Sequence, residues 1–272
     1  MIQFPNAKIN IGLNVVSKRP DGYHNLETVF YPIPLSDALE IIVNNDLDND
    51  YQLFNTGITV DAPTNENICV KALELIKKDH TIPPIEIHLH KATPFGAGLG
   101  GGSSDAAFML SMLNTLFELN ISNDELKKKA IQLGADVPFF IDNKPSFATG
   151  IGDLLQPINL DLSDYYLCLV KPPIHVSTPE AYSGITPKAS DRILPNDLNL
   201  PVEQWKDIVK NDFETSVFKK YPEIEKIKTE LYNQGAAYAA MSGSGSTVFG
   251  LFKDEPHFKV DPSYFVWSGK MK

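Results

Sequence analysis

The chain contains little cysteine and little arginine, two residue types that often define a protein's chemistry. Its 272 residues include two cysteines, Cys69 and Cys168, which stand far apart and form no C-x-x-C pair. This spacing argues against a zinc ribbon and a disulfide framework. The two arginines are Arg19 and Arg192, so no arginine cluster can hold a triphosphate through paired hydrogen bonds. Backbone N–H groups, a few lysines and Mg²⁺ would have to neutralise such a ligand.

Long apolar runs and a basic leader are also missing. No apolar run reaches 18 residues, and the first residues carry no basic segment before an apolar one; we therefore expect a cytoplasmic protein without a membrane segment. The net charge of −10 argues against nucleic acid as a partner, because nucleic-acid-binding proteins need a basic face. Hydrophobic residues make up 43% and charged residues 21% of the chain, which is typical of a globular fold. The oligomeric state is left open.

A glycine-rich loop between residues 93 and 105 is the most informative segment. Five of the nine residues from Gly96 to Ser104 are glycine, and an apolar, helix-like run follows at Ala106. Glycine lets the backbone approach a ligand closely. The following helix offers free N–H groups and the positive end of its dipole. Because a strand-like run precedes the loop, the pattern predicts a phosphate site and not a flexible linker.

The loop differs from the better-known phosphate loops. Gly96, Gly98 and Gly101 fit G-x-G-x-x-G, but the acid that a dinucleotide site needs at the end of the next strand is missing, since Glu118 belongs to the helix. A Walker loop requires a lysine, and this loop contains none. The chain also lacks His-Arg-Asp, Asp-Phe-Gly and G-x-S-x-G, which argues against a protein kinase and a serine hydrolase. A dinucleotide-dependent oxidoreductase is therefore disfavoured.

Hydrophobic periodicity predicts alternating strands and helices. In the first strand, Lys8 and Asn10 face one side and Ile9 and Ile11 the other, as on a half-buried strand. The predicted strands cover residues 8–15, 26–30, 38–43, 85–90 and 166–170 and flank residues 241–249, and the predicted helices cover 67–78, 105–119, 122–134, 202–210 and 222–234. This order predicts an α+β fold of two lobes with a hinge near residue 156.

Four further groups of polar residues are candidates for chemistry. Lys8 is either an ordinary solvated lysine or a functional one. Asp136 precedes an apolar run and is either a turn former or a functional carboxylate. His88 and His90 share one strand face and lack a third ligand, so we expect strand surface and not a metal site. Residues 242–246 form either a simple hairpin or a second backbone nest near the phosphates.

Several motifs together resemble those of the GHMP small-molecule kinases. The hallmark loop of that family, Pro-x-x-x-Gly-Leu-Gly-Ser-Ser, reads Pro94-Phe-Gly-Ala-Gly-Leu-Gly-Gly-Gly-Ser-Ser104 here. Within the family, segments 7–14, 19–24, 133–139 and 242–249 are similar to those of the kinases that act on a cytidine-diphosphate sugar alcohol. These motifs are well separated, stand in the right order and span nearly the whole chain. Residues 183–213 and the tail after 260 match weakly, and no role is predicted for them.

The resemblance implies a fold and a reaction. The N-terminal lobe, residues 1–156, would resemble domain 2 of ribosomal protein S5, with a left-handed βαβ crossover against the usual rule, and would bind ATP and carry catalysis. The C-terminal lobe, residues 157–272, would be ferredoxin-like and bind the substrate. The implied reaction is ATP-dependent phosphorylation of a tertiary 2-hydroxyl on the route to isoprenoid precursors that does not use mevalonate. A mevalonate or homoserine kinase is the alternative, and the Asp-Gly-Tyr-His turn separates the two. A catalytically silent nucleotide-binding module is a second alternative, disfavoured because both candidate catalytic residues are present.

The resemblance also assigns roles to residues. It implies that Asp136 removes the proton of the substrate hydroxyl or orients that hydroxyl, while Lys8 keeps Asp136 ionised and polarises the hydroxyl or the γ-phosphate. It places cytosine between the rings of Tyr23 and Tyr182, with His24 selecting the base. The implied ATP-binding residues are Asn67, Lys91, Pro94, Gly96, Gly98, Leu99, Gly100, Gly101, Gly102, Ser103 and Ser104, and the implied substrate-binding residues are Asn10, Tyr23, His24, Thr178 and Tyr182. Mg²⁺ is expected with ATP, and its ligands are unassigned.

Overall fold

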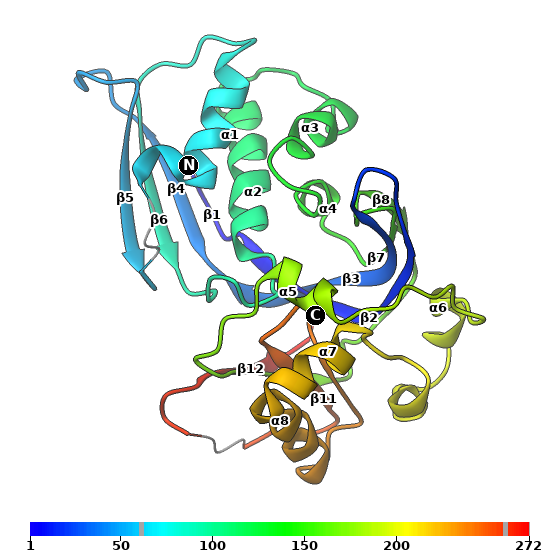
Figure 1. Ribbon diagram of the computed structural model, residues 1–272. Coiled ribbons are helices and arrows are strands. Elements are labelled where there is room, and N and C mark those ends of the chain that lie inside the picture. Colours follow the sequence, from blue (N-terminus) through cyan, green and yellow to red (C-terminus); the bar gives the residue numbers. More distant parts are fainter. Residues whose placement is uncertain (60–62, 258–260, 272) are drawn as a thin grey trace. The chain divides into compact units, whose positions relative to one another are not determined.

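The computed structural model describes residues 1–59, 63–257 and 261–271, which cluster into two compact units (Figure 1). Unit 1 comprises Met1–Ala7, Leu35–Phe95 and Gly100–Lys144, and unit 2 comprises Lys8–Pro34, Gly96–Leu99 and Pro145–Lys272. Strands and helices alternate in both units, which confirms the predicted α+β class. Within the glycine-rich loop, Gly96–Leu99 belong to unit 2, while the residues before Gly96 and from Gly100 onward belong to unit 1.

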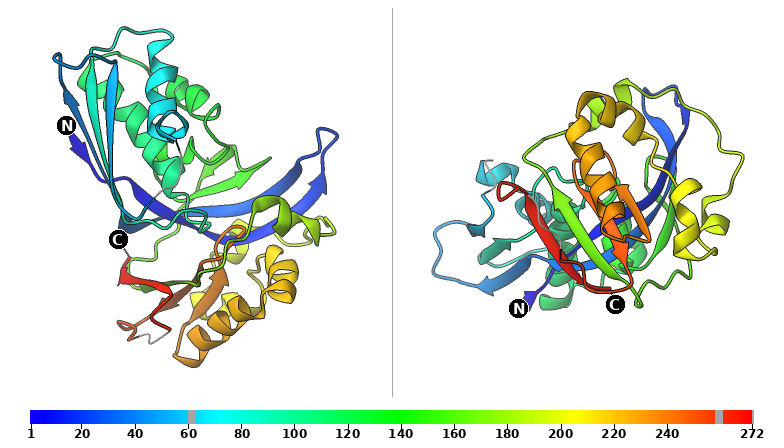
Figure 2. Two further views of the ribbon diagram at one scale, coloured as in Figure 1. Left: turned by 60° about the vertical axis from the view of Figure 1, so that its left-hand side comes forward. Right: turned by 90° about the horizontal axis from the view of Figure 1, so that it is seen from below.

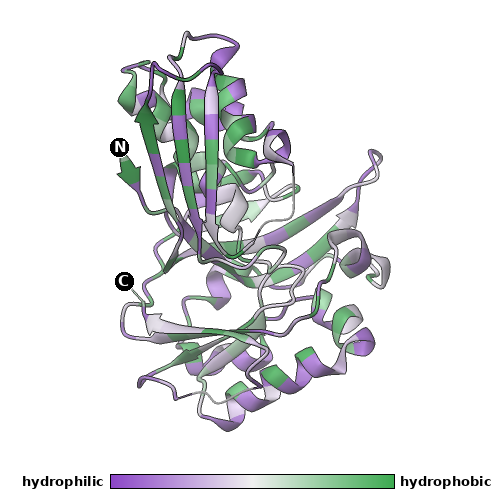
Figure 3. Cartoon of the chain, turned by 90° about the vertical axis from the view of Figure 1, so that its left-hand side faces the viewer, coloured by the Kyte–Doolittle hydropathy of each residue, from purple (hydrophilic) through white to green (hydrophobic). Residues whose placement is uncertain are grey.

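Unit 1 is a four-stranded sheet with helices on one face (Figure 1). The strand order is β1 (Ile2–Gln3), β4 (Ala38–Val43), β6 (Ile85–Lys91) and β5 (Tyr51–Gly57), with β5 parallel to β6 and the other pairs antiparallel. The helices are η1 (Thr64–Glu66), α1 (Ile68–Lys77), α2 (Gly101–Leu116), α3 (Asn123–Ala130) and α4 (Phe139–Asp142). Buried and partly exposed residues alternate along β6, and Figure 3 shows this banding of hydrophobic and hydrophilic residues on the sheet. The alternation places the core of unit 1 between this sheet and α1 and α2.

Unit 2 contains two further four-stranded sheets. The first has the order β2 (Asn6–Lys18), β3 (His24–Ser36), β7 (Ser146–Thr149) and β8 (Leu154–Pro157), and its β2 and β3 are long curved strands (Figure 2). The second has the order β10 (Tyr238–Met241), β11 (Val248–Phe252), β9 (Tyr166–Lys171) and β12 (Phe265–Lys270), with all pairs antiparallel. The helices are α5 (Thr178–Ser183), α6 (Leu194–Asp197), η2 (Val202–Asp207), α7 (Phe213–Lys220) and α8 (Pro222–Asn233). A core of apolar side chains from β9–β11, α7 and α8 closes the second sheet on one side.

Local sequence signals explain several element ends. Asn67 caps α1 by accepting a hydrogen bond from the backbone N–H of Cys69 (2.9 Å). Ser122 and Glu125 form a capping box at the start of α3, which satisfies two backbone donors reciprocally. Gly100 caps α2 in the left-handed conformation (φ 68°), which a glycine adopts without a Cβ penalty.

Other elements differ from the expectation. Helix α2 begins at Gly101, four residues before the predicted start at Asp105, so the loop's last glycines and both serines form its first turn. Strand β2 is buried on both faces and is not half-buried. No element was predicted where the structure has strands β1, β5, β7, β8 and β12 and helices η1, α4, α5, α6 and α7. The helix predicted at 202–210 is a short 3-10 helix, η2.

The two units divide the chain differently from the predicted lobes. Gln156, at the expected hinge, lies in β8 and pairs with Phe147 of β7. The chain instead changes unit between Lys144 and Pro145, and most of β2 and β3 belongs with the C-terminal half. The assignment of separate functions to residues 1–156 and 157–272 stays a prediction.

Candidate active site

The first turn of α2 presents free backbone donors. The first bond within the helix runs from the N–H of Ser104 to the carbonyl of Gly100 (2.9 Å). The N–H groups of Gly101, Gly102 and Ser103 therefore have no acceptor inside the helix. Because α2 is 16 residues long, its dipole adds positive potential at the same place. This arrangement suits a phosphate group.

The glycines of the loop have two different reasons to be glycine. A Cβ on Gly98 would lie 2.0 Å from the carbonyl oxygen of Ser242, and a Cβ on Gly101 would lie 2.7 Å from Cγ2 of Thr93. These two positions are closed by the protein's own packing. A Cβ on Gly102 would meet nothing within 4 Å, so this residue borders open space at the helix N-terminus.

Buried polar atoms near the same turn lack a partner within the described residues. They are Oγ1 of Thr93, Oγ of Ser104 and Oδ1 of Asp105. A buried hydroxyl or carboxylate oxygen without a hydrogen bond is unfavourable, and such atoms in native proteins usually meet a ligand, an ion or water. Their position beside the free N–H groups fits a polar, phosphate-bearing ligand.

A buried ion cluster lies under this turn. The ammonium group of Lys91, at the end of β6, contacts the carboxylates of both Asp37 and Asp105 (2.6 Å to Asp105). Asp37 also accepts hydrogen bonds from the backbone N–H groups of Ala92 and Thr93 (2.6 and 2.7 Å). The cluster ties the end of β6 to the first turns of α2. The structure thus gives Lys91 a structural role, and the ATP-binding role that the resemblance implied for it stays a prediction.

Burial and neighbouring charges shift the pKa values of Asp105 and Lys91 in this cluster. Burial raises the pKa of Asp105 to about 7, because the favourable Lys91 ammonium does not outweigh burial and the nearby Asp37 carboxylate. Burial alone would lower the pKa of Lys91, but the two carboxylates outweigh it and raise that pKa. Lys91 is therefore charged at neutral pH, while Asp105 titrates near neutrality.

Asp136 lies in the turn after α3, in unit 1, and is partly exposed. Its Oδ1 accepts a hydrogen bond from Oγ of Ser103 (2.6 Å), which belongs to the first turn of α2. The structure thus joins the predicted carboxylate to the predicted phosphate site through one hydrogen bond. Asp136 is thus a turn residue, while its role as a functional carboxylate stays a prediction.

Lys8 is buried and not solvated, with 5% of its surface exposed. Its ammonium group donates to Oδ1 of Asn10 (2.6 Å) and to the carbonyl of Gly98 (3.3 Å), and lies 4.8 Å from the ring centroid of Phe30. Asn10 in turn donates to Oγ1 of Thr28 (3.1 Å). A buried lysine held by such partners is a candidate for function and not an ordinary surface lysine.

The predicted base site shows an aromatic stack of its own. The ring of Tyr182, on α5, stacks on the imidazole of His24 with centroids 4.6 Å apart and planes at 15°. Phe213 packs edge-on against the same tyrosine (4.7 Å, 82°), and Tyr23 is 63% exposed. His24 thus covers one face of Tyr182, where a sandwiched base would have to replace or join it. The sandwich of cytosine between Tyr23 and Tyr182 stays a prediction.

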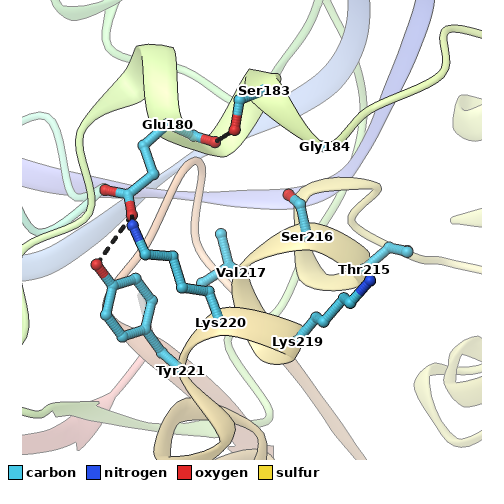
Figure 4. A pocket seen from close by; sticks show the side chains of 9 residues that line it. All are labelled: Glu180, Ser183, Gly184, Thr215, Ser216, Val217, Lys219, Lys220 and Tyr221. Atoms are coloured by element: carbon cyan, nitrogen blue, oxygen red, sulfur yellow. Dashed lines mark hydrogen bonds and ion pairs between the residues drawn. The ribbon is translucent and has the colours of Figure 1, made fainter.

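Helix α5 is fixed to α7 around a separate pocket of about 300 Å³ (Figure 4). Glu180 accepts a hydrogen bond from the hydroxyl of Tyr221 (2.9 Å) and pairs with Lys220. Ser216 donates to the carbonyl of Ala181 (2.8 Å). Neither Thr178 nor Tyr182 lines this pocket. The contacts of Glu180 and Ser216 therefore hold α5 in place and do not involve the two residues of α5 that are predicted to bind substrate.

Three more of the implied ATP-binding residues make structural contacts or are buried, and their roles toward ATP stay predictions. Asn67 caps α1, Leu99 is buried, and a Cβ on Gly96 would lie 2.8 Å from Nδ1 of His175.

His88 and His90 lie on the outer face of β6, as expected, where His88 contacts Glu86 (3.1 Å). In the three described ranges of the chain, no group of three His, Cys, Asp or Glu residues could hold a metal ion. None of the helices in those ranges combines the length and apolarity needed to cross a bilayer.

The structure brings the predicted residues together in two sets. Lys8, Asn10 and Gly98 meet in unit 2, and Ser103 and Asp136 meet in unit 1. The pairing of Lys8 with Asp136 stays a prediction. Sequence reasoning missed Asp37 and Asp105, although an acid directly after the loop serines was a visible signal for the second of them.

Comparisons with known proteins agree with these motifs. Residues 67–144 match the family described as GHMP kinases N terminal domain, and residues 200–259 match GHMP kinases C terminal. The chain is 58% identical to the 4-diphosphocytidyl-2-C-methyl-D-erythritol kinase of Parabacteroides distasonis, over 100% of both chains. It is similar to the crystal structure of a 4-(cytidine 5'-diphospho)-2C-methyl-D-erythritol kinase (TM-score 0.79, 33% identity, 92% of this chain and 90% of the other). The Methanococcus jannaschii mevalonate kinase shares the fold (TM-score 0.71, 15% identity, 100% and 98% covered).

Proposed function

The chain belongs to the GHMP kinase family, and on that premise we propose that it phosphorylates the 2-hydroxyl of 4-diphosphocytidyl-2-C-methyl-D-erythritol with ATP. The observation that carries the proposal is the full-length similarity to a kinase with this name, at 58% identity over 100% of both chains. The free N–H groups of α2 and the buried Lys8 supply the groups that phosphoryl transfer needs. Mevalonate and homoserine kinases share the fold at 15–16% identity, which supports no transfer of their substrates.

The phosphates of ATP are proposed to bind at the first turn of α2. The N–H groups of Gly101, Gly102 and Ser103 point along the helix axis toward a ligand, and the buried hydroxyl of Ser104 has no partner within the described residues. Mg²⁺ would be held mainly by phosphate oxygens and water, as is common for this ion, and would neutralise charge on the phosphates.

Asp136 and Lys8 are proposed to act on the reacting groups. Phosphoryl transfer asks the protein mainly for alignment and charge stabilisation. Asp136 would accept the proton of the 2-hydroxyl, or orient that hydroxyl. The hydrogen bond from Ser103 to Asp136 (2.6 Å) would fix the orientation of the carboxylate. Lys8 would stabilise negative charge that develops on the transferred phosphoryl group and the attacking oxygen. A tertiary alcohol is crowded, so its placement matters as much as the basicity of Asp136.

The cytidine end of the substrate is proposed to bind near Tyr182 and His24. Stacking on an aromatic ring contributes about 1–3 kcal/mol per base without choosing between bases. Selection of cytosine would come from the polar groups of His24, because a closed site rejects a base that leaves its hydrogen-bonding groups unpaired. Asn10 and Thr178 are proposed to contact the rest of the substrate. We also propose that both substrates are met in the cytoplasm, and that nucleic acid and membranes are not partners.

Turnover of one substrate tests this function. Purified protein with ATP, MgCl₂ and 4-diphosphocytidyl-2-C-methyl-D-erythritol should release ADP and form a product one phosphate heavier. Phosphorus NMR should show a new phosphomonoester on a tertiary carbon, while the diphosphate bridge stays unchanged. Asp136→Asn, measured in the same assay, controls for a contaminating kinase. ADP release without the phosphomonoester, or equal rates for both proteins, would contradict the proposal.

A further inference from the structure

The turn between β10 and β11, at residues 242–247, is not accounted for by the proposed function. Ser242 is completely buried, and its hydroxyl makes two hydrogen bonds outside its own hairpin. It accepts from the backbone N–H of Asn10 (3.1 Å) and donates to the carbonyl of Gly98 (2.8 Å). One hydroxyl thus joins β2 to the first part of the glycine-rich loop.

The carbonyl of Gly98 is shared with Lys8. It accepts from Oγ of Ser242 (2.8 Å) and from the ammonium group of Lys8 (3.3 Å). Gly98 has a positive φ of 74° and no side chain, so its peptide orientation depends on what its backbone atoms bind. Asn10, whose N–H is bound by Ser242, also accepts from the Lys8 ammonium (2.6 Å). Ser242 therefore contacts two residues, Asn10 and Gly98, whose oxygen atoms accept hydrogen bonds from Lys8.

A second buried side chain fixes the turn itself. Asn211 is 3% exposed and donates to the carbonyls of Met241 and Gly243 (both 2.8 Å). Its Oδ1 accepts from the backbone N–H of Phe213 (3.0 Å). Because all three bonds are satisfied, the amide holds the backbone on both sides of Ser242 in one conformation. This gives a role to one residue of the segment 183–213, for which the sequence predicted none.

We propose that Ser242 is a positioning residue: its hydroxyl holds the Gly98 carbonyl and the Asn10 backbone in the orientation that aims the Lys8 ammonium group. The inference rests on the proposed function, since it requires that Lys8 acts in phosphoryl transfer. Ser242 acts on Lys8 through the Gly98 carbonyl and the Asn10 backbone. Loss of its hydroxyl leaves the buried N–H of Asn10 without its acceptor and the Gly98 carbonyl with one donor fewer. Misalignment of a charged group lowers the rate steeply.

The chain offers a matched control in the same turn. Ser246 is also completely buried, and its hydroxyl also donates to a backbone carbonyl, that of Ile174 (2.5 Å). This bond leads away from Gly98 and Lys8. Ser242→Ala and Ser246→Ala therefore remove the same group from the same turn, and they differ in whether the lost bond reaches the Lys8 site.

The test is a double-mutant cycle on kcat with Lys8→Ala. Ser242→Ala should lower kcat about tenfold or more, while Ser246→Ala stays within about twofold of the parent. In the Lys8→Ala background, Ser242→Ala should change kcat by no more than about twofold, because the group it positions is gone. Ser242→Thr, which keeps the hydroxyl, should restore most of the rate. If Ser242→Ala does not fold, Ser242→Cys replaces it, since the thiol is a weak donor of similar size.

The outcomes separate this inference from the function it rests on. Equal losses of kcat from both serine variants would show a general effect on the turn and overturn the inference. The same loss from Ser242→Ala with and without Lys8 would also overturn it, while the proposed function would stand if Lys8→Ala alone is slow. If Lys8→Ala keeps the parental kcat, the catalytic role of Lys8 fails, and the positioning role of Ser242 fails with it.

Discussion

Gly102→Ala should separate the stability of this protein from its affinity for ATP. Gly102 is the second residue of α2, has helical backbone, and an added Cβ would meet nothing within 4 Å. Alanine in a helix is favoured over glycine by up to about 1 kcal/mol. The free energy of unfolding should therefore stay the same or rise by up to about 1 kcal/mol.

Binding should change in the opposite direction. A phosphate oxygen bound to the N–H of Gly102 would approach the new methyl group closely. The same phosphate would also be bound by the neighbouring N–H groups, so it could not move away without weakening those bonds. We expect the dissociation constant of ATP to rise about tenfold or more, which equals about 1.4 kcal/mol of binding free energy. Gly102→Val should also fold, and it should bind ATP more weakly than Gly102→Ala does, because a branched side chain fills more of the open space.

Gly98→Ala gives the contrasting case. Its Cβ would lie 2.0 Å from the Ser242 carbonyl, and its φ of 74° disfavours any side chain. The backbone conformation alone costs about 1–2 kcal/mol, so this variant should lose stability before binding can be compared. Denaturant unfolding and calorimetric titration with ATP measure the two quantities on each variant. A stable Gly102→Ala that binds ATP with parental affinity would refute the placement of the phosphates at the first turn of α2.

Three further predictions concern the remaining site residues. Asp136→Asn and Lys8→Ala should each lower kcat by about 10²–10³, and steady-state rates within about threefold of the parent would contradict their roles. The pKa of Asp105 is raised from 3.8 when unfolded to about 7 when folded, so its contribution to stability falls as the pH rises from about 4 to about 7. Asp105→Asn should remove this loss. The free energy of unfolding of the variant, measured with urea, should therefore rise relative to that of the parent between pH 5 and pH 8. A difference between the two proteins that stays constant with pH would refute the titration of Asp105. Tyr182→Ala should raise KM for the cytidine substrate more than Tyr23→Ala does, because the Tyr182 ring is held in place by Phe213, whereas Tyr23 is 63% exposed. Equal kcat/KM for the cytidine and uridine forms of the substrate would place the base elsewhere.

Local patterns in the sequence were sufficient where neighbours along the chain decide the structure. The glycines before α2, the capping box at Ser122 and the alternation in β6 all act within a few residues. Strand β5 escaped prediction because it lies at the exposed edge of its sheet, where the buried–polar alternation is weak. Helix α7 begins at the last residue of the weakly matched segment and is eight residues long, with Phe213 and Val217 as its buried residues.

Long-range contacts could not be predicted in this way. Lys8 is buried because Gly98 and Asn10 surround its ammonium group, and Gly98 is 90 residues away along the chain. The cluster of Asp37, Lys91 and Asp105 joins three segments whose separate sequences show ordinary charged residues. The bond between Ser242 and Gly98 spans 144 residues. Such contacts depend on how strands and turns pack, and no local spacing encodes them.

A competition experiment tests the proposed function most directly. The protein is mixed with ATP, MgCl₂ and equal concentrations of 4-diphosphocytidyl-2-C-methyl-D-erythritol, mevalonate and homoserine, and the phosphorylated products are quantified by mass spectrometry at early times. Under these conditions the product ratio equals the ratio of the kcat/KM values. We predict that the phosphorylated cytidine compound is formed in at least about a hundredfold excess, as expected when a site built for a substrate's polar groups meets compounds that lack them. Preferential phosphorylation of mevalonate or homoserine would contradict the assignment.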